Sequence, residues 1–517
     1  MDFKKTALGI EFGSTRIKAV LIDENQSPVA SGGYEWENKL EDGIWTYSME
    51  DVHKGAQECF ASLRNDVKEQ FGVELSEVGS IGISGMMHGY LPFDKDGRQL
   101  AKFRTWRNTV TGEAAEKLTE YLNFNIPQRW SVAHLYQEYL NGENYIENID
   151  FMTTLAGYIH WKLSGEKVMG VGEASGMFPI DSDNCDYDEN MVAKFHELTG
   201  INIRDIFPKV LSAGEEAGYL TEEGARFLDP TGVLKAGIPL CPCEGDAGTG
   251  MVATNSVRVY TGNVSAGTSD FAMIVVDHQL GVYREVDMVT TPDGASVAMV
   301  HCNNCTTDIN AWVNLFDEFG KLMGFEVDKG TLFTKLFESA LKADYDAGGL
   351  ISFNYYSGEG VTDFDEGRPL FVRRADAKFN LPNVMRMHLM SAMATLKIGM
   401  DLLIDNENVR IDKLYGHGGF FKTPEVGQRI LSAAIGSPVT VMETAGEGGA
   451  YGVALLAGYL IWKTDGESLP DYLDNRVFAG SEGSTVLADK DEIDAYSAFI
   501  DSYIKAIPLE RSAIENV

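Results

Sequence analysis

The sequence predicts an α/β protein built of two related domains. The chain has 517 residues, which is too long for a single hydrophobic core. Apolar strands alternate with amphipathic helices, and a strand, glycine turn and strand near the N-terminus return as a pattern near residue 255. We expect two domains, residues 1–252 and 253–517, the second with a helical C-terminal extension.

The composition narrows the classes of function. Apolar residues make up 44% of the chain, and the formal net charge is -34. Because polyanion binding depends on clustered Lys and Arg, this charge disfavours nucleic acid and membranes as partners. No apolar run reaches the roughly 20 residues of a membrane span, and the segment before Gly13 is too short for a signal peptide. We therefore expect a cytoplasmic protein that acts on small ligands.

The six cysteines and nine histidines do not predict a metal site. Cys302 and Cys305 have the spacing of half a zinc site, but no second pair or flanking histidine completes it. We expect reduced, structural thiols and no metal held by His or Cys.

The N-terminal elements follow from short-range patterns. Residues 7–23 predict a strand, a tight glycine turn and a second strand, which is a hairpin rather than a strand entering a helix. Ser48 is expected to begin a helix that ends at Gly72, because apolar residues recur every three or four positions between them. A strand is predicted next, over 78–84.

The second half restarts this pattern. Residues 257–275 again predict a strand, a glycine turn with hydroxyl residues and a strand, which favours an internal duplication. Thr423 is expected to cap a helix with Pro424 at its first position and Gly436 just past its end. The other predicted elements are an apolar helix over 387–405, a strand over 414–421, a strand over 439–442, a glycine-rich loop over 445–449, a helix ending near Trp462 and a helix over 490–506.

Four glycine turns, spread over both halves, are the main functional signal. Glycine lets backbone N–H groups approach an anion closely, and neighbouring hydroxyls add donors. The chain has no GxxxxGK[ST] P-loop and no GxGxxG turn opening a βαβ unit, which disfavours the two commonest nucleotide folds. Glu11 ends an apolar strand before the first turn, and it is either a ligand-facing carboxylate or a solvated acid at a strand end. Asp246 lies among small residues, and it either faces a ligand or hydrogen-bonds its own turn.

Six motifs, in order from about residue 6 to residue 462, resemble those of the FGGY carbohydrate kinase family. They are IEFGSTRIK at 10–18, GISGMMHGY at 82–90, EGDAGTG at 244–250, SAGTSD at 265–270, YSGEG at 356–360, and GHGGFFKTP at 416–424 with GEGGAYGVAL at 446–455. Met87-His88-Gly89 is most similar to the xylulokinase branch. The resemblance implies two ribonuclease-H-like domains of the actin and hexokinase type with a cleft between them.

The resemblance also implies a role for each matched position. Asp246 would be the catalytic base, and Glu11 and Asp246 would be the carboxylates on the metal side, with Mg²⁺ held through water. The predicted ATP and phosphate ligands are Gly13, Ser14, Thr15, Lys18, Gly267, Thr268 and Ser269, with Gly418, Gly419 and Lys422 beside the adenosine. The predicted sugar contacts are Met87, His88, Trp106, Arg107, Asn108, Gly245 and Asp246. Lys18 alternatively makes only a salt bridge.

These matches predict an ATP- and Mg²⁺-dependent kinase that phosphorylates a terminal hydroxyl of a small sugar such as the ketopentose xylulose. Departures from the family pattern leave other acceptors open: Glu11 replaces the usual Asp, Met86 replaces the usual Gln, and Trp106-Arg107-Asn108 replaces a common Trp-Asn-Asp. Ribulose, polyol and aldonate kinases of the same family are the alternatives. A non-catalytic sensor that binds ATP and sugar and an actin-like ATPase that acts on protein partners also stay open. The resemblance is also compatible with a homodimer.

Overall fold

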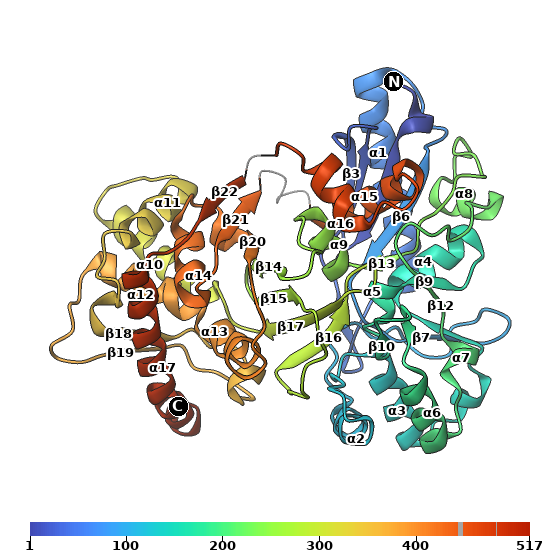
Figure 1. Ribbon diagram of the computed structural model, residues 1–517. Coiled ribbons are helices and arrows are strands. Elements are labelled where there is room, and N and C mark those ends of the chain that lie inside the picture. Colours follow the sequence, from blue (N-terminus) through green and yellow to red (C-terminus); the bar gives the residue numbers. More distant parts are fainter. Residues whose placement is uncertain (443–447, 482) are drawn as a thin grey trace. The chain divides into compact units, whose positions relative to one another are not determined.

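The computed structural model describes residues 1–442, 448–481 and 483–517, and it divides into two compact units (Figure 1). The first unit comprises Met1–Val257, Asp277–Val297 and Glu447–Gly480. The second comprises the rest of the chain from Arg258 to Val517. Two segments from the second half of the sequence therefore belong to the first unit, and the contiguous boundary at 252/253 stays a prediction.

A five-stranded mixed sheet forms the core of the first unit, in the order β13-β6-β1-β2-β3. β1 (Ala7–Phe12) and β2 (Arg16–Ile22) form the predicted antiparallel hairpin, and β3 (Pro28–Glu35) extends it. β6 (Ser80–Gly85) and β13 (Glu244–Gly245) add parallel strands on the other side of β1. The carboxyl ends of β1, β6 and β13 therefore lie at one edge of the sheet, where we expect the site.

Two long helices cover strands of this sheet. α1 (Met49–Phe71) packs on β2 and β3; it begins after Ser48, which accepts a hydrogen bond from the backbone of Asp51, and ends at Gly72, as predicted. α15 (Gly448–Trp462) packs on β1, β2 and β6. α15 approaches so closely that a Cβ on Gly9 of β1 would lie 2.2 Å from a backbone oxygen of the helix.

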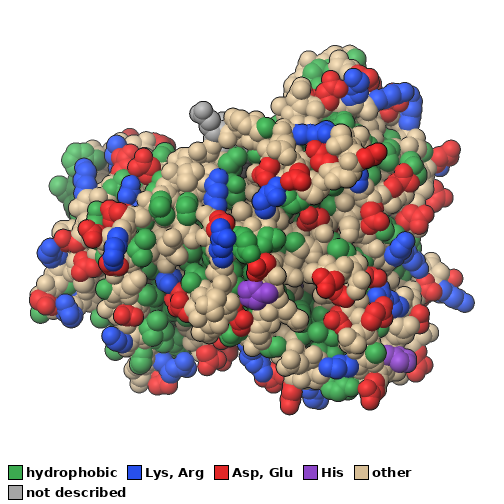
Figure 2. Space-filling view, in the orientation of Figure 1, with side chains coloured by type: hydrophobic (Ala, Val, Ile, Leu, Met, Phe, Trp, Pro, Cys, Tyr) green, Lys and Arg blue, Asp and Glu red, His purple; other side chains and the backbone are tan. Residues whose placement is uncertain are grey.

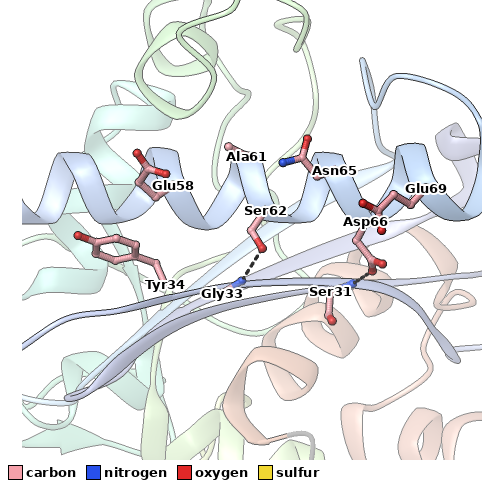
Figure 3. Close-up of a pocket in the computed structure, with 9 residues that line it drawn as sticks. All are labelled: Ser31, Gly33, Tyr34, Glu58, Ala61, Ser62, Asn65, Asp66 and Glu69. Carbon is pink, nitrogen blue, oxygen red and sulfur yellow. Dashed lines mark hydrogen bonds between the residues drawn. The ribbon is translucent and has the colours of Figure 1, made fainter.

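The outer edge of the sheet, β3, is capped by side chains of α1 (Figure 3). Asp66 Oδ2 accepts the backbone N–H of Ser31 at 2.8 Å, and Ser62 Oγ accepts that of Gly33 at 3.3 Å. These contacts satisfy N–H groups that an edge strand otherwise leaves open to another strand. A polar cavity of about 540 Å³ lies beside them, and none of the predicted site residues lines it.

The remaining elements of the first unit are short. They are β4 (Lys39–Glu41), β5 (Ile44–Thr46), β7 (Leu91–Phe93), α2 (Gly112–Leu122), α3 (Ser131–Asn141), β8 (Phe151–Thr153), α4 (Leu155–Ser164), β9 (Val168–Gly170), α5 (Val171–Ala174), β10 (Ile180–Asp181), β11 (Asp186–Tyr187), α6 (Glu189–Thr199), α7 (Ile203–Ile206), β12 (Lys209–Leu211), α8 (Glu222–Leu228), α9 (Asp246–Ala253), β16 (Val286–Thr290) and α16 (Leu469–Tyr472).

The second unit repeats the strand order of the first. Its sheet contains the run β17-β15-β14-β20-β21-β22, in which β14 and β15 form the predicted hairpin and β20 is parallel to β14. The strands are β14 (Thr261–Ala266), β15 (Asp270–Val275), β17 (Ser296–Cys302), β20 (Lys413–His417), β21 (Val439–Met442) and β22 (Gly483–Val486). The order β17-β15-β14-β20-β21 matches β3-β2-β1-β6-β13, so the predicted internal duplication is confirmed.

The predicted single helix over 387–405 is wrong. The structure has α12 (Leu381–Ala392) and α13 (Ala394–Asp401), and the helical segments on either side of Met393 are bent by 41°. Met393 leaves the helical ladder with φ -102° and ψ 0°, and its N–H bonds to the carbonyl three residues back. The break was missed because apolar residues continue on both sides of Met393 and no Gly or Pro lies next to it.

The predicted cap at Thr423 is also wrong. α14 (Val426–Ile435) begins after Glu425, which has a positive φ of 67° and whose N–H donates to Gln428 Oε1 at 3.3 Å. The strand predicted over 414–421 ends at His417, and a 3₁₀ turn that buries two phenylalanines then delays the start of the helix. Gly436 ends α14, as predicted.

The remaining helices and strands of the second unit include a longer C-terminal helix than predicted, since α17 runs over Lys490–Asn516 with Pro508 inside it. The others are α10 (Thr307–Leu322), α11 (Lys329–Ala340), β18 (Leu350–Phe353) and β19 (Leu370–Arg373). Residues 445–447 of the predicted glycine loop over 445–449 lie outside the described residues.

Charged side chains are mixed on the surface, and long apolar helices are rare. Figure 2 shows acidic and basic side chains interspersed over the face drawn. Over residues 1–442, 448–481 and 483–517, no single helix has the length and apolarity of a membrane span, and one bent pair, Leu381–Ala392 with Ala394–Asn406, meets these two criteria jointly. All six cysteines are free thiols.

Candidate functional site

Asp246 is the first residue of α9 and follows β13 directly. Its Oδ1 accepts the backbone N–H of Met87 at 3.0 Å. Burial raises the pKa of Asp246, whereas the N–H groups of Met87 and Ala247 act to lower it. Its position in the first turn of a helix also favours the ionised form. The first unit therefore holds this carboxylate in one place while leaving it able to ionise.

Glu11 lies at the carboxyl end of β1, opposite the start of α15. The backbone N–H of Ala450 donates to Glu11 Oε2 at 3.2 Å. A Cβ on Gly449 would lie 2.4 Å from Glu11 Oε1, so glycine is needed to leave room for the carboxylate. Burial and then the charge of Asp246 raise the pKa of Glu11 to about 7. Glu11 and Asp246 are thus coupled acids of one unit.

These two acids are candidates for holding a divalent cation. Carboxylate oxygens are hard ligands, and Mg²⁺ keeps several waters, so one or two carboxylates suffice. A bound cation would offset the repulsion between the two charges. Across the described part of the chain, no group of three or more His, Cys, Asp or Glu side chains could hold a metal. The residues present therefore fit a hydrated Mg²⁺ rather than a fully protein-ligated metal.

The turn Gly13–Thr15 has fixed carbonyl oxygens and open N–H groups. Trp36 donates its indole N–H to Gly13 O at 2.7 Å and its backbone N–H to Thr15 O at 3.1 Å. Tyr47 donates its hydroxyl to Ser14 O at 2.5 Å. No hydrogen bond recorded among the described residues uses the N–H of Ser14 or Thr15. Adjacent open N–H groups of this kind are suited to an anion such as phosphate.

Lys18 lies directly opposite Glu11 in the register of β1 and β2. Its charge lowers the pKa of Glu11, against the larger effect of burial. The geometry therefore supports an electrostatic contact with Glu11, and phosphate binding by Lys18 stays a prediction.

Met87 and His88 follow β6 at the same edge of the sheet. His88 has a positive φ of 69°, and its Nδ1 lies 3.1 Å from the carbonyl oxygen of Gly176. A Cβ on Gly176 would lie 2.7 Å from that nitrogen, so the close approach needs glycine. Arg129 donates its Nε–H to His88 Nε2 at 3.1 Å. Both ring nitrogens of His88 are therefore engaged by the protein itself.

The segment 106–108 gives its three predicted sugar contacts different surroundings. Trp106 is 37% exposed, and its indole N–H donates to Ser14 Oγ at 3.0 Å. The guanidinium of Arg107 lies 4.0 Å from the ring centre of Trp45. Asn108 is buried, and its amide donates to two backbone carbonyls at 2.8 and 2.9 Å. Asn108 thus holds the local backbone, and its sugar contact stays a prediction.

The second glycine turn, Gly267–Ser269, is fixed by the residues that lead into α10. Thr306 donates its backbone N–H at 3.0 Å and its hydroxyl at 2.6 Å to the carbonyl oxygen of Gly267. Cys305 donates its N–H to the carbonyl oxygen of Thr268 at 2.9 Å. The carbonyls of this turn are therefore held as those of the first turn are.

Gly418, Gly419 and Lys422 follow β20 in the second unit. Gly418 has a φ of 100°, and a Cβ there would lie 2.4 Å from the carbonyl oxygen of Ala266 at the end of β14. No atom lies within 4 Å of a Cβ placed on Gly419, and Lys422 is exposed. This segment thus combines open backbone beside the second turn with an exposed cation.

Sequence profiles connect both units with a known family. The N-terminal domain of the FGGY family of carbohydrate kinases matches residues 6–253, and the C-terminal domain matches residues 262–461. The chain belongs to the FGGY family of carbohydrate kinases. It is therefore a phosphotransferase of the ATP-binding type, and the predicted family, enzyme class and two-domain actin-like α/β fold are confirmed.

Similar proteins carry different substrate names at low identity. A xylulose kinase from Haemophilus influenzae is 22% identical over 522 residues, which cover 96% of this kinase and 98% of that relative. A structure described as a xyloylose kinase from Brucella ovis has a TM-score of 0.79 at 19% identity, over 98% of this chain and 99% of that chain. A gluconate kinase from Lactobacillus acidophilus has a TM-score of 0.79 at 16% identity, over 97% of each chain. The structural matches confirm the fold alone.

Two buried acids behind Asp246 of this kinase were not predicted from the sequence. Glu244 Oε2 accepts the backbone N–H of Glu173 at 2.8 Å, and burial raises the pKa of Glu244 to about 8. Burial also raises the pKa of Glu173 well above the usual carboxyl range. A Cβ on Gly245 would lie 2.4 Å from Glu173 Oε2, which makes Gly245 a spacer as well as a predicted sugar contact. The position of Glu244, two residues before Asp246, was a sequence signal that could have identified it.

Proposed function

We propose that this kinase transfers the γ-phosphate of ATP to a terminal hydroxyl of a small sugar, with the ketopentose xylulose as the first candidate acceptor. The observation that carries the proposal is the edge where β1, β6 and β13 end. Asp246, Glu11 and the N–H of Met87 lie together there. A base, a second acid and a fixed backbone donor are the parts that hydroxyl activation needs.

Asp246 is the proposed general base. Phosphoryl transfer asks mainly that the acceptor hydroxyl be held in line with the γ-phosphate and that charge on the phosphoryl oxygens be stabilised. The hydroxyl becomes acidic as the new P–O bond forms, so a carboxylate of ordinary or modestly raised pKa is sufficient to accept its proton. The Met87 N–H at 3.0 Å keeps Asp246 oriented while the proton is transferred.

Glu11 and Asp246 would hold Mg²⁺ through water, and the bound ion would neutralise charge on the transferred phosphoryl group. The open N–H groups of Ser14 and Thr15, with their hydroxyls, are proposed phosphate ligands. In the second unit, the turn Gly267–Ser269 is the proposed counterpart. Gly418, Gly419 and Lys422 are proposed to flank the adenosine.

The sugar contacts are proposed to come from the first unit. Met87 and Gly245 are beside Asp246, and a Cβ on Gly245 would already lie 3.0 Å from Met87 Cγ. Trp106 offers an exposed apolar ring face, and Arg107 a guanidinium. The name xylulose kinase among the similar proteins supports a ketopentose, and the gluconate kinase with the same TM-score of 0.79 makes an aldonate the second candidate.

The test is ADP release by the purified kinase with Mg²⁺-ATP and a panel of ketopentoses, deoxyketoses, polyols and aldonates. We expect release that depends on added sugar and is largest with a ketopentose. ATPase activity that is indifferent to every compound would contradict the kinase proposal and favour an actin-like ATPase.

We also propose a cytoplasmic homodimer. The support for a second copy is a set of exposed apolar side chains on α10 and the loop after it: Leu315, Phe319, Leu322, Met323, Phe325 and Val327. Monomeric proteins rarely expose large contiguous apolar patches. Light scattering on the eluting protein should give twice the mass of 56.8 kDa, and Phe319→Glu should return it to one copy.

A further inference from the structure

We infer that Arg129 is the side chain that recognises the acceptor's hydroxyls, and that this acceptor is a neutral polyhydroxy compound rather than a sugar acid. This inference rests on the proposed kinase function and narrows it by naming the substrate class. It concerns a residue that the sequence patterns did not single out, and every contact that supports it lies within the first unit.

Arg129 lies next to a buried residue, and its side chain is partly exposed. The next residue, Trp130, is fully buried and immediately precedes α3. The side chain of Arg129 is 23% exposed, whereas its ion-pair partner Asp287 is 9% exposed. An arginine with a fixed base and an accessible guanidinium can meet a ligand without losing much conformational freedom.

The contact between Arg129 and His88 changes the role expected for His88. Because Arg129 donates Nε–H to His88 Nε2, that nitrogen acts as an acceptor and the ring proton lies on Nδ1. Nδ1–H then donates to Gly176 O at 3.1 Å. With both nitrogens used, the imidazole positions the guanidinium, and direct recognition of sugar hydroxyls passes to Arg129.

Asp287 holds the other side of the guanidinium. Arg129 Nη2 donates to Asp287 Oδ2, and Asn125 Nδ2 donates to Asp287 Oδ1 at 3.0 Å. Burial raises the pKa of Asp287, and the charge of Arg129 opposes that shift. Of the five N–H groups of a guanidinium, one on Nε and one on Nη2 are used by these contacts. The remaining N–H groups are donors for a ligand.

The guanidinium is connected to the proposed base by a short path. Asp246 Oδ1 accepts the N–H of Met87, and His88 is the next residue along the chain. Arg129 is then bonded to the His88 ring. One backbone step and one imidazole therefore separate the two groups, a scale that suits a small sugar whose terminal hydroxyl meets Asp246 while other hydroxyls meet Arg129.

The charges around Arg129 favour a neutral acceptor. Asp287 is ion-paired with Arg129 and offsets its charge. A carboxylate on the acceptor would therefore meet, at Arg129, an ion pair with little net charge to attract it. Vicinal hydroxyls need only the donor capacity that the guanidinium retains.

The first test compares Arg129→Gln with the unaltered kinase in the ADP-release assay. A lost hydrogen bond from a charged donor corresponds to a roughly 10- to 100-fold rise in the KM for the sugar. The KM for ATP should change by less than about twofold, because a structural defect would affect both. Arg98→Gln is the matched control, since Arg98 is 74% exposed, and it should leave both constants unchanged.

The outcomes separate the inference from the function on which it rests. If the unaltered kinase releases no sugar-dependent ADP, the proposed function fails. If it does so and Arg129→Gln leaves the sugar KM unchanged, Arg129 is not the recognition residue. If the unaltered kinase prefers an aldonate to every ketose and polyol, the neutral-acceptor assignment is overturned.

A second variant keeps the inference testable if Arg129→Gln does not fold. Asp287→Asn retains the guanidinium and removes the charge that cancels it. The ratio of kcat/KM for an aldonate to that for the best neutral sugar should then rise by roughly tenfold. A merely structural role of Asp287 would lower both values together, and an unchanged ratio would contradict the charge balance.

Discussion

The two units contain the same hairpin, but acidic residues take opposite places around its turn. Counted from the turn glycines, Glu11 before the first turn corresponds to Ser265 before the second. After the turns, Phe12 pairs with Ile17 in the first hairpin and Ala266 pairs with Asp270 in the second, so Asp270 takes the place of Ile17. The first unit therefore has its acid on the strand before the turn, whereas the second unit has its acid on the strand after the turn.

The surroundings of the two acids differ as well. Glu11 is coupled to Asp246, the proposed base, and accepts an N–H from α15. Asp270 is fully buried, and neither of its carboxylate oxygens has a hydrogen-bond partner in the described structure. Burial and the charge of Glu359 raise the pKa of Asp270. The two units thus share the turn, but the side chains around it differ. The acid of the first unit lies beside the proposed base, and the acid of the second unit is buried without a hydrogen-bond partner in the described structure.

Glu11→Gln should have the largest effect among variants that test this asymmetry. Removing a carboxylate that orients a hydrated metal typically costs roughly 10- to 100-fold in metal affinity or activity. We expect a drop of that size in kcat/KM together with a higher Mg²⁺ requirement, measured by ADP release over a magnesium titration. The matched variant Ser265→Ala alters the corresponding position of the second unit and should change the Mg²⁺ requirement little. Equal effects of the two variants on the Mg²⁺ requirement would contradict the proposed difference between the two units.

The pH dependence of magnesium use should give the next largest effect. The pKa of Glu11 is about 7, so below this pH the side chain is protonated and a cation must displace the proton. The Mg²⁺ concentration for half-maximal activity should fall as pH rises, by about tenfold per pH unit below 7. Glu11→Gln should lack this dependence. A Mg²⁺ requirement of the unaltered kinase that does not change with pH would mean that Glu11 does not hold the metal.

Asp270→Asn should have the smallest effect, and on stability rather than on the metal. Its folded-state pKa is raised above the unfolded value, so Asp270 costs stability increasingly as pH rises from the usual carboxyl range. We expect the variant to melt about 2–4 °C higher at pH 8, with the gain disappearing in acid, where the group is protonated in both states.

Asp376→Asn is the matched control for that comparison, since the Asp376 side chain is 75% exposed. It should leave the melting temperature unchanged at both pH values. A pH-independent shift for Asp270→Asn would mean that the buried carboxyl is not the source of the instability.

Local patterns were sufficient for much of the fold. The hairpin over 7–23 and the helix from Ser48 to Gly72 were predicted because turn glycines and cap residues act within a few positions. The bend at Met393 was missed because it depends on packing and has no Gly or Pro to mark it. Likewise, α15 belongs to the first unit through contacts with strands far away in sequence.

Site residues that belong to a sequence motif could be predicted, whereas those that depend on a contact between distant segments could not. Asp246 and Glu11 stand out beside glycine-rich turns. The hydrogen bond from Arg129 to His88 joins residues 41 positions apart, and no sequence pattern predicts a contact between them. Asn108 shows the opposite case, because it lies in a matched segment yet its amide donates to backbone carbonyls.

Asp246 of the first unit is the residue proposed to accept the proton of the acceptor hydroxyl. Sugar-stimulated ADP release and ATP binding, measured on one preparation of Asp246→Asn, test it most directly. We predict a folded protein that binds ATP within about twofold of the unaltered kinase and whose sugar-dependent turnover falls by roughly 10²- to 10⁴-fold. Undiminished turnover in this variant would contradict the account.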